Sequence, residues 1–330
     1  MIIGVNCLGI SSQYLGGVTS FAMGLIKGLT ASSRSNILYI YVNADNAHLF
    51  KGFAINDQVK IILCQSYTPL RAAVAKVLLL VLPASLSVCV NKFIFKSLRS
   101  QIESDCDILY TPSATLLFMG FEIPTVVSMH DVQHLHYPEY FSAMRLLFRE
   151  KGYYLTAKYA TYLQASSDFI KSDFLSHYAF LESDKVVMIN EGVSQDEFII
   201  DKLEAIDNLA KYNLSNDFPF IFYPAQLWHH KDHLTVLRAL YILRESYGRT
   251  LHLVLTGAKF SASQEIFKLI DELDLTDQVS YLGKVPFEDI VSLYRLSKLF
   301  LTATIYESSS LPMLEAAASG AQIMASNTAP

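Results

Sequence analysis

Residues 299–325 read LFLTATIYESSSLPMLEAAASGAQIMA, and this stretch decides the fold. Leu299–Thr304 is a short apolar run of the kind found in buried parallel strands. A serine-rich turn follows, and the Leu- and Ala-rich residues after it predict a helix that continues to Gly320. Gln322–Ala325 is apolar and predicts a second strand. Strand, helix and strand in this order indicate a parallel βαβ unit.

The same alternation runs through the other parts of the 330-residue chain. A first series of predicted strands comprises Ile2–Leu8, Ile37–Asn43, Val59–Cys64, Asp107–Thr111 and Thr125–Ser128. A second series comprises Phe220–Ala225, Leu251–Thr256, Val279–Leu282 and the two strands above, with helical patterns such as Lys231–Arg244 between them. The polar stretch Asp196–Asp217 separates the series. We therefore expect an α/β protein of two Rossmann-like domains, residues 1–195 and 196–330, facing each other across a ligand-binding cleft.

Composition excludes several classes of protein. The chain is 52% hydrophobic and 17% charged, which rules out intrinsic disorder. A net charge of −5 provides no global positive field for nucleic acid. The four cysteines form no CxxC pair, so we expect neither a disulfide framework nor a zinc ribbon. The N-terminus has no basic region of the kind that opens a secretory signal, and a cytoplasmic protein is expected.

One segment departs from the alternating pattern. Gln58–Ile102 contains no acidic residue, and Val77–Val90 contains no charge. The uncharged run is shorter than the ~20 residues that a membrane-spanning helix needs, and Pro83 interrupts it. Residues 70–99 therefore suggest a basic, apolar hairpin in peripheral contact with the inner face of the cytoplasmic membrane. The alternative is a buried helical excursion of the first domain.

The turn at residues 307–315 is the strongest candidate for chemistry. Serines just before a helix leave backbone N–H groups that can bind a phosphate. Glu307 lies at the strand end, where a carboxylate can contact a sugar hydroxyl or a developing positive charge. Glu315, about two turns into the helix, could accept hydrogen bonds from ribose hydroxyls. An ordinary capped helix with a solvated Glu315 is the structural alternative.

This turn resembles retaining glycosyltransferases of family 4, which have the GT-B fold. Their hallmark is a pair of glutamates separated by seven residues, with a small-residue turn and Leu-Pro between them, as in Glu307 to Glu315. The resemblance implies that Glu307 is catalytic and lies near the donor sugar, and that Glu315 holds the donor ribose. It also implies that the donor pyrophosphate is bound by the backbone amides of Ser309, Ser310 and Leu311.

Two further turns fit the same family. Tyr223–His233 resembles the turn that opens the second domain, where an arginine and a lysine reach the donor phosphates. Lys231 fits that lysine, while Gln226 replaces the arginine and can still donate a hydrogen bond. Gly16 and Gly17 open the first helix, with apolar positions expected at Phe21, Leu25 and Leu29, and let a ligand approach the backbone on the acceptor side.

The segment Ser128–Ser142 resembles a branch of mannosyl- and rhamnosyltransferases of bacterial surface polysaccharides. In that branch the histidine ending the fifth strand faces the reacting sugar, which implies a catalytic His130 oriented by Asp131. His134 and His136 are two residues apart and would face opposite ways on a strand, so we expect no metal site here. Ser167 is the expected cap of a later helix.

Family members normally continue beyond the strand at Gln322–Ala325 with a further strand and several helices. Here we expect a second domain that lacks its last elements and exposes apolar surface, although it retains both glutamates.

The predicted function is transfer of a hexose, with mannose or rhamnose favoured, from a GDP-, dTDP- or UDP-linked sugar to a saccharide or polyprenyl-linked saccharide acceptor in cell-surface polysaccharide synthesis. The resemblance implies retention of configuration, with no cofactor and no metal. A non-catalytic nucleotide-sugar-binding subunit is the alternative, favoured by Gln226 and the short C-terminus. A Rossmann oxidoreductase is disfavoured because no GxGxxG follows the first strand.

Overall fold

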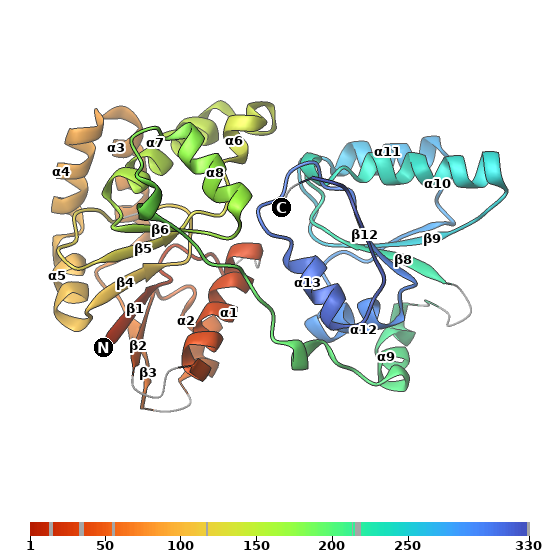
Figure 1. The fold of residues 1–330 in the computed structure, drawn as a ribbon, viewed down its shortest axis with the longest axis horizontal. Helices are drawn as coiled ribbons and strands as arrows, with labels where there is room; N and C mark the ends of the chain where they lie inside the picture. The colour runs from red at the N-terminus through yellow and green to blue at the C-terminus, as the bar shows by residue number, and fades with distance from the viewer. Residues whose placement is uncertain are drawn as a thin grey trace. The chain divides into compact units, whose positions relative to one another are not determined.

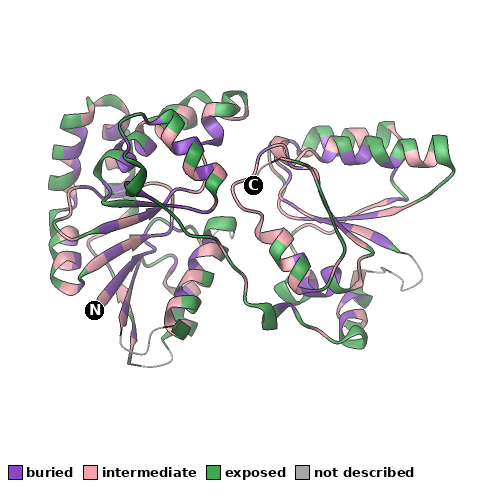
Figure 2. Ribbon diagram, in the orientation of Figure 1, coloured by how far each residue is buried: buried purple, intermediate pink, exposed green. Residues whose placement is uncertain are grey.

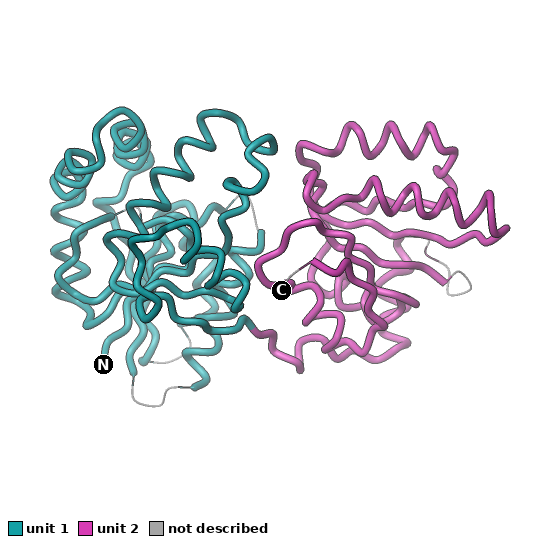
Figure 3. Tube along the Cα trace, turned by 45° about the horizontal axis from the view of Figure 1, so that its top comes forward, with its two compact units in different colours: residues 1–191 teal, residues 192–330 magenta. Residues whose placement is uncertain are grey.

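The computed structural model describes residues 1–12, 16–32, 36–54, 57–116, 118–212, 214 and 219–328. The chain divides into two compact units, residues 1–191 and residues 192–330 (Figure 3). The division lies between Glu191 and Gly192, a few residues before the boundary expected from the sequence.

Parallel strands form the sheet of unit 1, in the order β3-β2-β1-β4-β5-β6-β7 within the described residues. The strands are β1 (Ile2–Asn6), β2 (Ile37–Val42), β3 (Val59–Leu63), β4 (Ile108–Thr111), β5 (Thr125–Ser128), β6 (Tyr162–Ala165) and β7 (Val186–Met188). The five strands predicted for this half are confirmed. Strand order reverses beside β1, so the carboxyl ends of β1 and β4 flank the usual ligand-binding position of an open sheet.

Helices cover both faces of this sheet (Figure 1). They are α1 (Gly17–Ser32), α2 (Ala47–Phe50), α3 (Pro69–Val81), α4 (Ala84–Ile94), α5 (Lys96–Asp105), α6 (Gln133–His136), α7 (Ala143–Tyr159) and α8 (Asp168–His177). Ala22 and Ile26 of α1 are in one core cluster with Val5, whereas Leu98 of α5 packs with Tyr41 in another. Because side chains alternate along a strand, these clusters lie on opposite faces.

The buried face of α1 differs from the one predicted from the sequence. The buried side chains are Thr19, Ala22 and Ile26. Of the predicted residues Phe21, Leu25 and Leu29, all are partly buried, and Leu29 packs against the core cluster that contains Ile26. Helix α8 begins as expected, because the Ser167 side chain accepts a hydrogen bond from the amide of Ile170 at 3.3 Å.

Unit 2 contains a second parallel sheet, ordered β10-β9-β8-β11-β12 in its described residues. The strands are β8 (Phe220–Pro224), β9 (His252–Thr256), β10 (Val279–Tyr281), β11 (Leu299–Thr302) and β12 (Ile323–Ala325), all predicted from the sequence. The helices are α9 (Lys202–Leu209), α10 (His233–Tyr247), α11 (Ser263–Glu272), α12 (Phe287–Leu296) and α13 (Leu311–Ala318). The prediction of two Rossmann-like α/β domains is confirmed.

The core of unit 2 has two halves, one on each side of its sheet (Figures 1 and 2). Helices α10 and α11 cover one face through Leu237 and Ile266. Helices α9, α12 and α13 cover the other, where Phe222 and Phe300 are fully buried beside Tyr294. Strand β12 lies at the end of the described sheet, and its side chains Ile323 and Met324 are 39% and 55% exposed.

A close backbone approach fixes the turn that leaves β8. Gly257 follows β9 with φ +121°, and a Cβ there would lie 2.6 Å from the carbonyl oxygen of Ala225. Its amide donates to the carbonyl of Gly283 at 2.8 Å. Only glycine fits this conformation in this space, so the packing of the loop after β9 positions the turn after β8.

We predict that Gly257→Ala lowers the free energy of unfolding of unit 2 by about 3 kcal/mol, because it combines backbone strain with overlap against Ala225. Gly248→Ala is the matched control, since Gly248 also has positive φ (61°) but nothing lies within 4 Å of its added Cβ. We expect a loss of about 1 kcal/mol for the control. Denaturant unfolding of both variants measures the difference, and equal losses would contradict the account of this loop.

Candidate active site

Two turns lie at the carboxyl edge of the sheet in unit 2. The first follows β8 and is held by the loop after β9: the Leu227 amide donates to the carbonyl of Ala258 at 3.0 Å, and Trp228 stacks on Phe260 with ring centroids 3.9 Å apart. The indole N–H of Trp228 donates to Oε1 of Gln226 at 3.0 Å. The side-chain oxygen of Gln226 is thus occupied by the indole, and the side-chain amide nitrogen of Gln226 points its N–H groups elsewhere as hydrogen-bond donors.

The second turn follows β11 and is bonded directly to the first. The Ile305 amide donates to the carbonyl of His230 at 2.9 Å, and the Thr304 hydroxyl donates to the same carbonyl at 3.1 Å. Next to these bonds, Nζ of Lys231 donates to the Glu307 carboxylate. Both side chains are less than one-fifth exposed. The structure therefore brings together two predicted site residues that lie 76 positions apart.

A hollow of about 280 Å³, partly open to solvent, adjoins this ion pair. Glu307 and Ser310 line it, together with Thr302, Thr304, Met313, Ala325, Ser326 and Thr328. Hydroxyl groups are common in this lining, so it suits a polar ligand. Lys231 contacts the lining of the hollow at Glu307.

The N-terminus of α13 borders the hollow through Ser310, the N-cap residue, whose side chain makes no capping bond. Pro312 has no N–H, and the Met313 amide donates to the carbonyl of Ser310 at 2.9 Å. Within the described first turn of α13, Leu311 is thus the residue whose amide is placed to bind an anion. The predicted phosphate site formed by the amides of Ser309, Ser310 and Leu311 stays a prediction.

Glu315 faces a different neighbour. The hydroxyl of Tyr294, on α12, donates to Oε2 of Glu315 at 2.8 Å. Burial raises the pKa of Glu315, and the hydrogen bond from Tyr294 offsets part of that rise. The hydroxyl orients the carboxylate in the free protein, and Tyr294 was not predicted from the sequence as part of the site.

In unit 1, His130 follows the carboxyl end of β5. Its Nε2 lies 2.8 Å from the carbonyl oxygen of Pro112, its Nδ1 lies 3.6 Å from Oε1 of Glu191, and Phe21 packs edge-on against the ring. Burial lowers the pKa of His130, but the carboxylate of Glu191 and the carbonyl of Pro112 outweigh it, so the net pKa is raised. This environment favours an imidazolium at the site.

Asp131 does not have the partner predicted for it. Its carboxylate pairs with Arg149 on α7 and accepts from the amide of Gln133 at 2.9 Å. The carboxylate beside His130 is Glu191, which is 5% exposed. Glu191 follows β7, and a carboxylate after a parallel strand was the signal that could have identified it.

Gly16 precedes α1, and Gly17 is the first residue of that helix. The Gly16 carbonyl accepts from the amides of Thr19 and Ser20, and an added Cβ at Gly17 would meet nothing within 4 Å. Packing therefore does not require glycine at position 17, and the approach of a ligand to this turn stays a prediction, with a flexible turn as the alternative.

Residues 205–330 match the family Glycosyl transferases group 1. This region of the chain is a glycosyl transferases group 1 domain. It contains Gln226, Lys231 and the whole turn from Glu307 to Glu315. The match agrees with the predicted resemblance to family 4 glycosyltransferases, and the two glutamates lie within the matched region.

Relatives of this chain include O-antigen chain mannosyltransferase B of Escherichia coli, 26% identical over 202 residues. That match covers 61% of this chain and 52% of the relative. The Serotype-specific mannosyltransferase WbdA of Escherichia coli is 30% identical over 154 residues, which are 46% of this chain and 19% of WbdA. The chain spans about half the length of the first relative and less of the second.

Solved structures share the fold. The Anabaena protein HepE, crystallised with UDP and glucose, superposes with a TM-score of 0.70 at 17% identity and covers 99% of this chain and 81% of its own. WaaG, a glycosyltransferase involved in lipopolysaccharide biosynthesis, gives a TM-score of 0.66 at 15% identity over 98% of this chain and 80% of WaaG.

We predict that Glu191→Gln lowers the pKa of His130, because it removes the carboxylate that favours the imidazolium. A histidine whose folded-state pKa is raised stabilises the fold fully below its unfolded pKa, and that contribution is lost as pH rises through the folded pKa. The wild type should show this pH-dependent loss of stability, and the variant should lack it.

Histidine NMR titration, combined with unfolding at several pH values, provides the measurement. His134 is the internal control, because burial lowers its pKa to about 4 and it does not contact Glu191. A His130 pKa unchanged by the substitution would contradict the assigned role of Glu191.

Proposed function

We propose that this chain is a retaining hexosyltransferase. It moves a hexose, with mannose favoured over rhamnose, from a nucleotide-sugar to a saccharide or polyprenyl-linked saccharide acceptor in cell-surface polysaccharide synthesis. The observation that carries the proposal is the contact of Lys231 with Glu307 beside the Ser310 hollow, inside a group 1 domain. The mannosyltransferase names of the curated relatives support mannose.

In this proposal unit 2 binds the donor. Lys231 and the amides of Ser309, Ser310 and Leu311 neutralise the diphosphate, and Gln226 supplies a neutral hydrogen bond. Glu315 accepts from the ribose, and Glu307 lies near the sugar. Donors fixed at the leaving diphosphate stabilise the charge that develops as the glycosidic bond breaks. The leaving group is GDP, dTDP or UDP. Lys231, the backbone amides and Gln226 hold its diphosphate without a metal ion in this proposal.

Unit 1 presents the acceptor in this proposal, with Gly16, Gly17, His130 and Asp131 on the acceptor side. A cationic His130 would stabilise negative charge near the reacting sugar. A phosphate oxygen of the donor takes the proton of the acceptor hydroxyl, since retention places both on the same face of the sugar. This account requires no separate protein base.

A transfer assay tests the function. The full chain is incubated with GDP-mannose, dTDP-rhamnose or UDP-glucose and with a mannose-terminated lipid acceptor, and products are identified by mass spectrometry. We expect a product one hexose larger, with GDP-mannose the best donor. Donor binding without product would instead support the non-catalytic nucleotide-sugar-binding subunit, and absence of donor binding would contradict both.

We predict that Glu315→Ala weakens nucleotide-sugar binding about ten- to a hundredfold, the effect of losing a charged hydrogen-bond acceptor. Calorimetry with GDP-mannose measures the affinity, and Glu288→Ala, at an exposed position of α12, is the control. Because the substitution leaves the buried Tyr294 hydroxyl without its partner, circular dichroism accompanies the titration. Unchanged affinity in a folded variant would remove Glu315 from the ribose site.

A membrane contact is proposed for helices α3 and α4. Four side chains of α3 at successive turns are between 43% and 73% exposed: Leu70, Val74, Val77 and Val81. Phe93 of α4 is 82% exposed. No helix in the described part of the chain is both long and apolar enough to cross a membrane. An exposed apolar stripe with lysines beside it suits peripheral binding to an anionic leaflet, the inner face of the cytoplasmic membrane.

Replacing Lys76, Lys92 and Lys96 with Gln should weaken binding to phosphatidylglycerol vesicles about a hundredfold, at roughly 1 kcal/mol for each lysine. The matched control replaces three exposed lysines of unit 2, Lys268, Lys284 and Lys298. Co-sedimentation measures the binding. Equal sedimentation of both triple variants, or binding that is indifferent to anionic lipid, would count against the membrane contact.

A further inference from the structure

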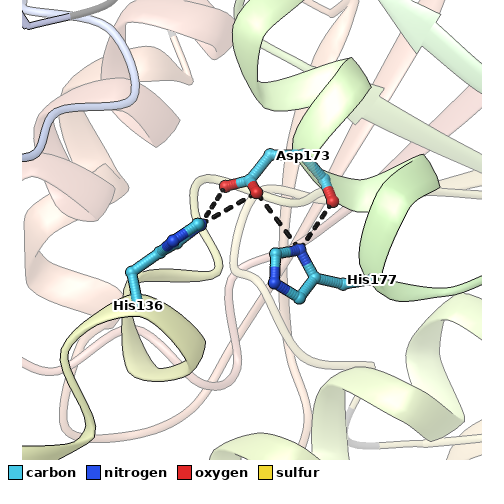
Figure 4. A group of neighbouring side chains, drawn as sticks. All are labelled: His136, Asp173 and His177. Atoms are coloured by element: carbon cyan, nitrogen blue, oxygen red, sulfur yellow. Dashed lines mark hydrogen bonds and ion pairs between the residues drawn. The ribbon is translucent and has the colours of Figure 1, made fainter.

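Three side chains that the proposed transfer does not use form a cluster in unit 1 (Figure 4). Nε2 of His136 lies 2.8 Å and 2.9 Å from the two carboxylate oxygens of Asp173. Nδ1 of His177 lies 3.2 Å from Oδ1 of Asp173. One ligand atom from each residue lies within 4.8 Å of the others. The carboxylate thus stands between two imidazole nitrogens.

The fold brings these residues together from two helices. Asp173 and His177 are four positions apart on α8, so both lie on one side of that helix. His136 ends α6, a single helical turn, and points toward α8 (Figure 4). The sequence did not suggest this set, because His134 and His136 were considered as residues of a strand. In α6 the two histidines contact different partners: His134 is buried against Tyr153, and His136 contacts Asp173.

The three side chains of the cluster differ in how far they are exposed to solvent. The Asp173 side chain is 6% exposed, whereas those of His136 and His177 are 35% and 31% exposed. The carboxylate is therefore held by the protein, while both imidazoles can be reached from solvent. Two imidazole nitrogens and a carboxylate oxygen are the donors that zinc and neighbouring divalent transition metals prefer, and they are poor for Mg²⁺ and Ca²⁺.

We propose that His136, Asp173 and His177 bind a divalent transition-metal ion of the Zn²⁺ type, with water completing the coordination. Tetrahedral Zn²⁺ holds nitrogen and oxygen ligands at about 2.0–2.2 Å, which places neighbouring ligand atoms roughly 3.3 Å apart. The contacts of 2.8 Å and 3.2 Å to Asp173 must open slightly to admit the ion. The ligand atoms of the two histidines lie within 4.8 Å of each other and must approach to about the same spacing. Nδ1 of His177 also faces the carbonyl of Asp173 at 2.9 Å, and Nε2 of His136 donates to the Asp173 carboxylate. On metal binding the proton of each imidazole therefore moves to its other ring nitrogen, Nε2 of His177 and Nδ1 of His136.

The bound ion would join α6 to α8. Helix α6 begins two residues after Asp131, so the joined segment includes the loop that carries His130 and Asp131. Metal binding would therefore stabilise this loop in unit 1. The transfer chemistry proposed above does not require this ion, and the inference does not depend on that chemistry.

Titration calorimetry of the chelator-treated full chain with ZnCl₂ tests the site, with MgCl₂ as the comparison ion. We expect one Zn²⁺ per chain, no Mg²⁺ binding, and a rise in melting temperature on adding Zn²⁺. Asp173→Asn and His136→Gln should each weaken Zn²⁺ binding at least about tenfold. His48→Gln, at an exposed position of α2, is the matched control and should bind as the wild type does.

A second measurement does not depend on the variants. Co²⁺ bound to the wild-type chain should give the visible absorption of a four- or five-coordinate ion with nitrogen ligands, and Zn²⁺ should displace it. Absence of Zn²⁺ binding to the wild type would overturn the proposal and leave the cluster as a hydrogen-bonded link between α6 and α8. Zn²⁺ binding that Asp173→Asn and His136→Gln leave unchanged would also overturn it.

Discussion

The contact between Lys231 and Glu307 is the interaction on which the proposed site depends. It joins the turn after β8 to the turn after β11, and the backbone bond from Ile305 to His230 lies beside it. Each charge is mostly withdrawn from water, so either one alone would be costly to keep there. A ligand that carries its own negative charge can replace the carboxylate as the partner of Lys231. The pair thus holds a lysine ready at the edge of the sheet.

The same contact bears on how the proposed site, with few cations, would bind a diphosphate. Gln226 stands where the family has an arginine and is oriented by Trp228, so it contributes a dipole and no charge. In the proposed function Lys231, together with the backbone amides of Ser309, Ser310 and Leu311, would then provide most of the attraction. Gly257 contributes to this arrangement, because it lets the loop after β9 approach the turn after β8 closely enough to fix the segment between Gln226 and Lys231.

The sequence predicted the strands well and the side-chain partners poorly. Thr125–Ser128 was predicted to the residue, since a buried parallel strand is a local pattern of apolar residues. Glu307 and Lys231 were predicted singly, but their contact depends on strand order, which no local pattern contains. For the same reason Asp131 was assigned to His130 when Glu191, sixty positions later, takes that place. Asp173 and His177 were missed because His136 meets them only after α8 packs beside α6.

The most direct test of the Lys231 site is the preference for a second phosphate. Calorimetry would compare GDP with GMP on the wild type and on Lys231→Met, with Lys268→Met, at an exposed position of α11, as the control. The account predicts that the wild type and the control bind GDP at least about tenfold more tightly than GMP, a difference of about 1.4 kcal/mol, and that Lys231→Met loses this preference. An equal preference in all three proteins would contradict it.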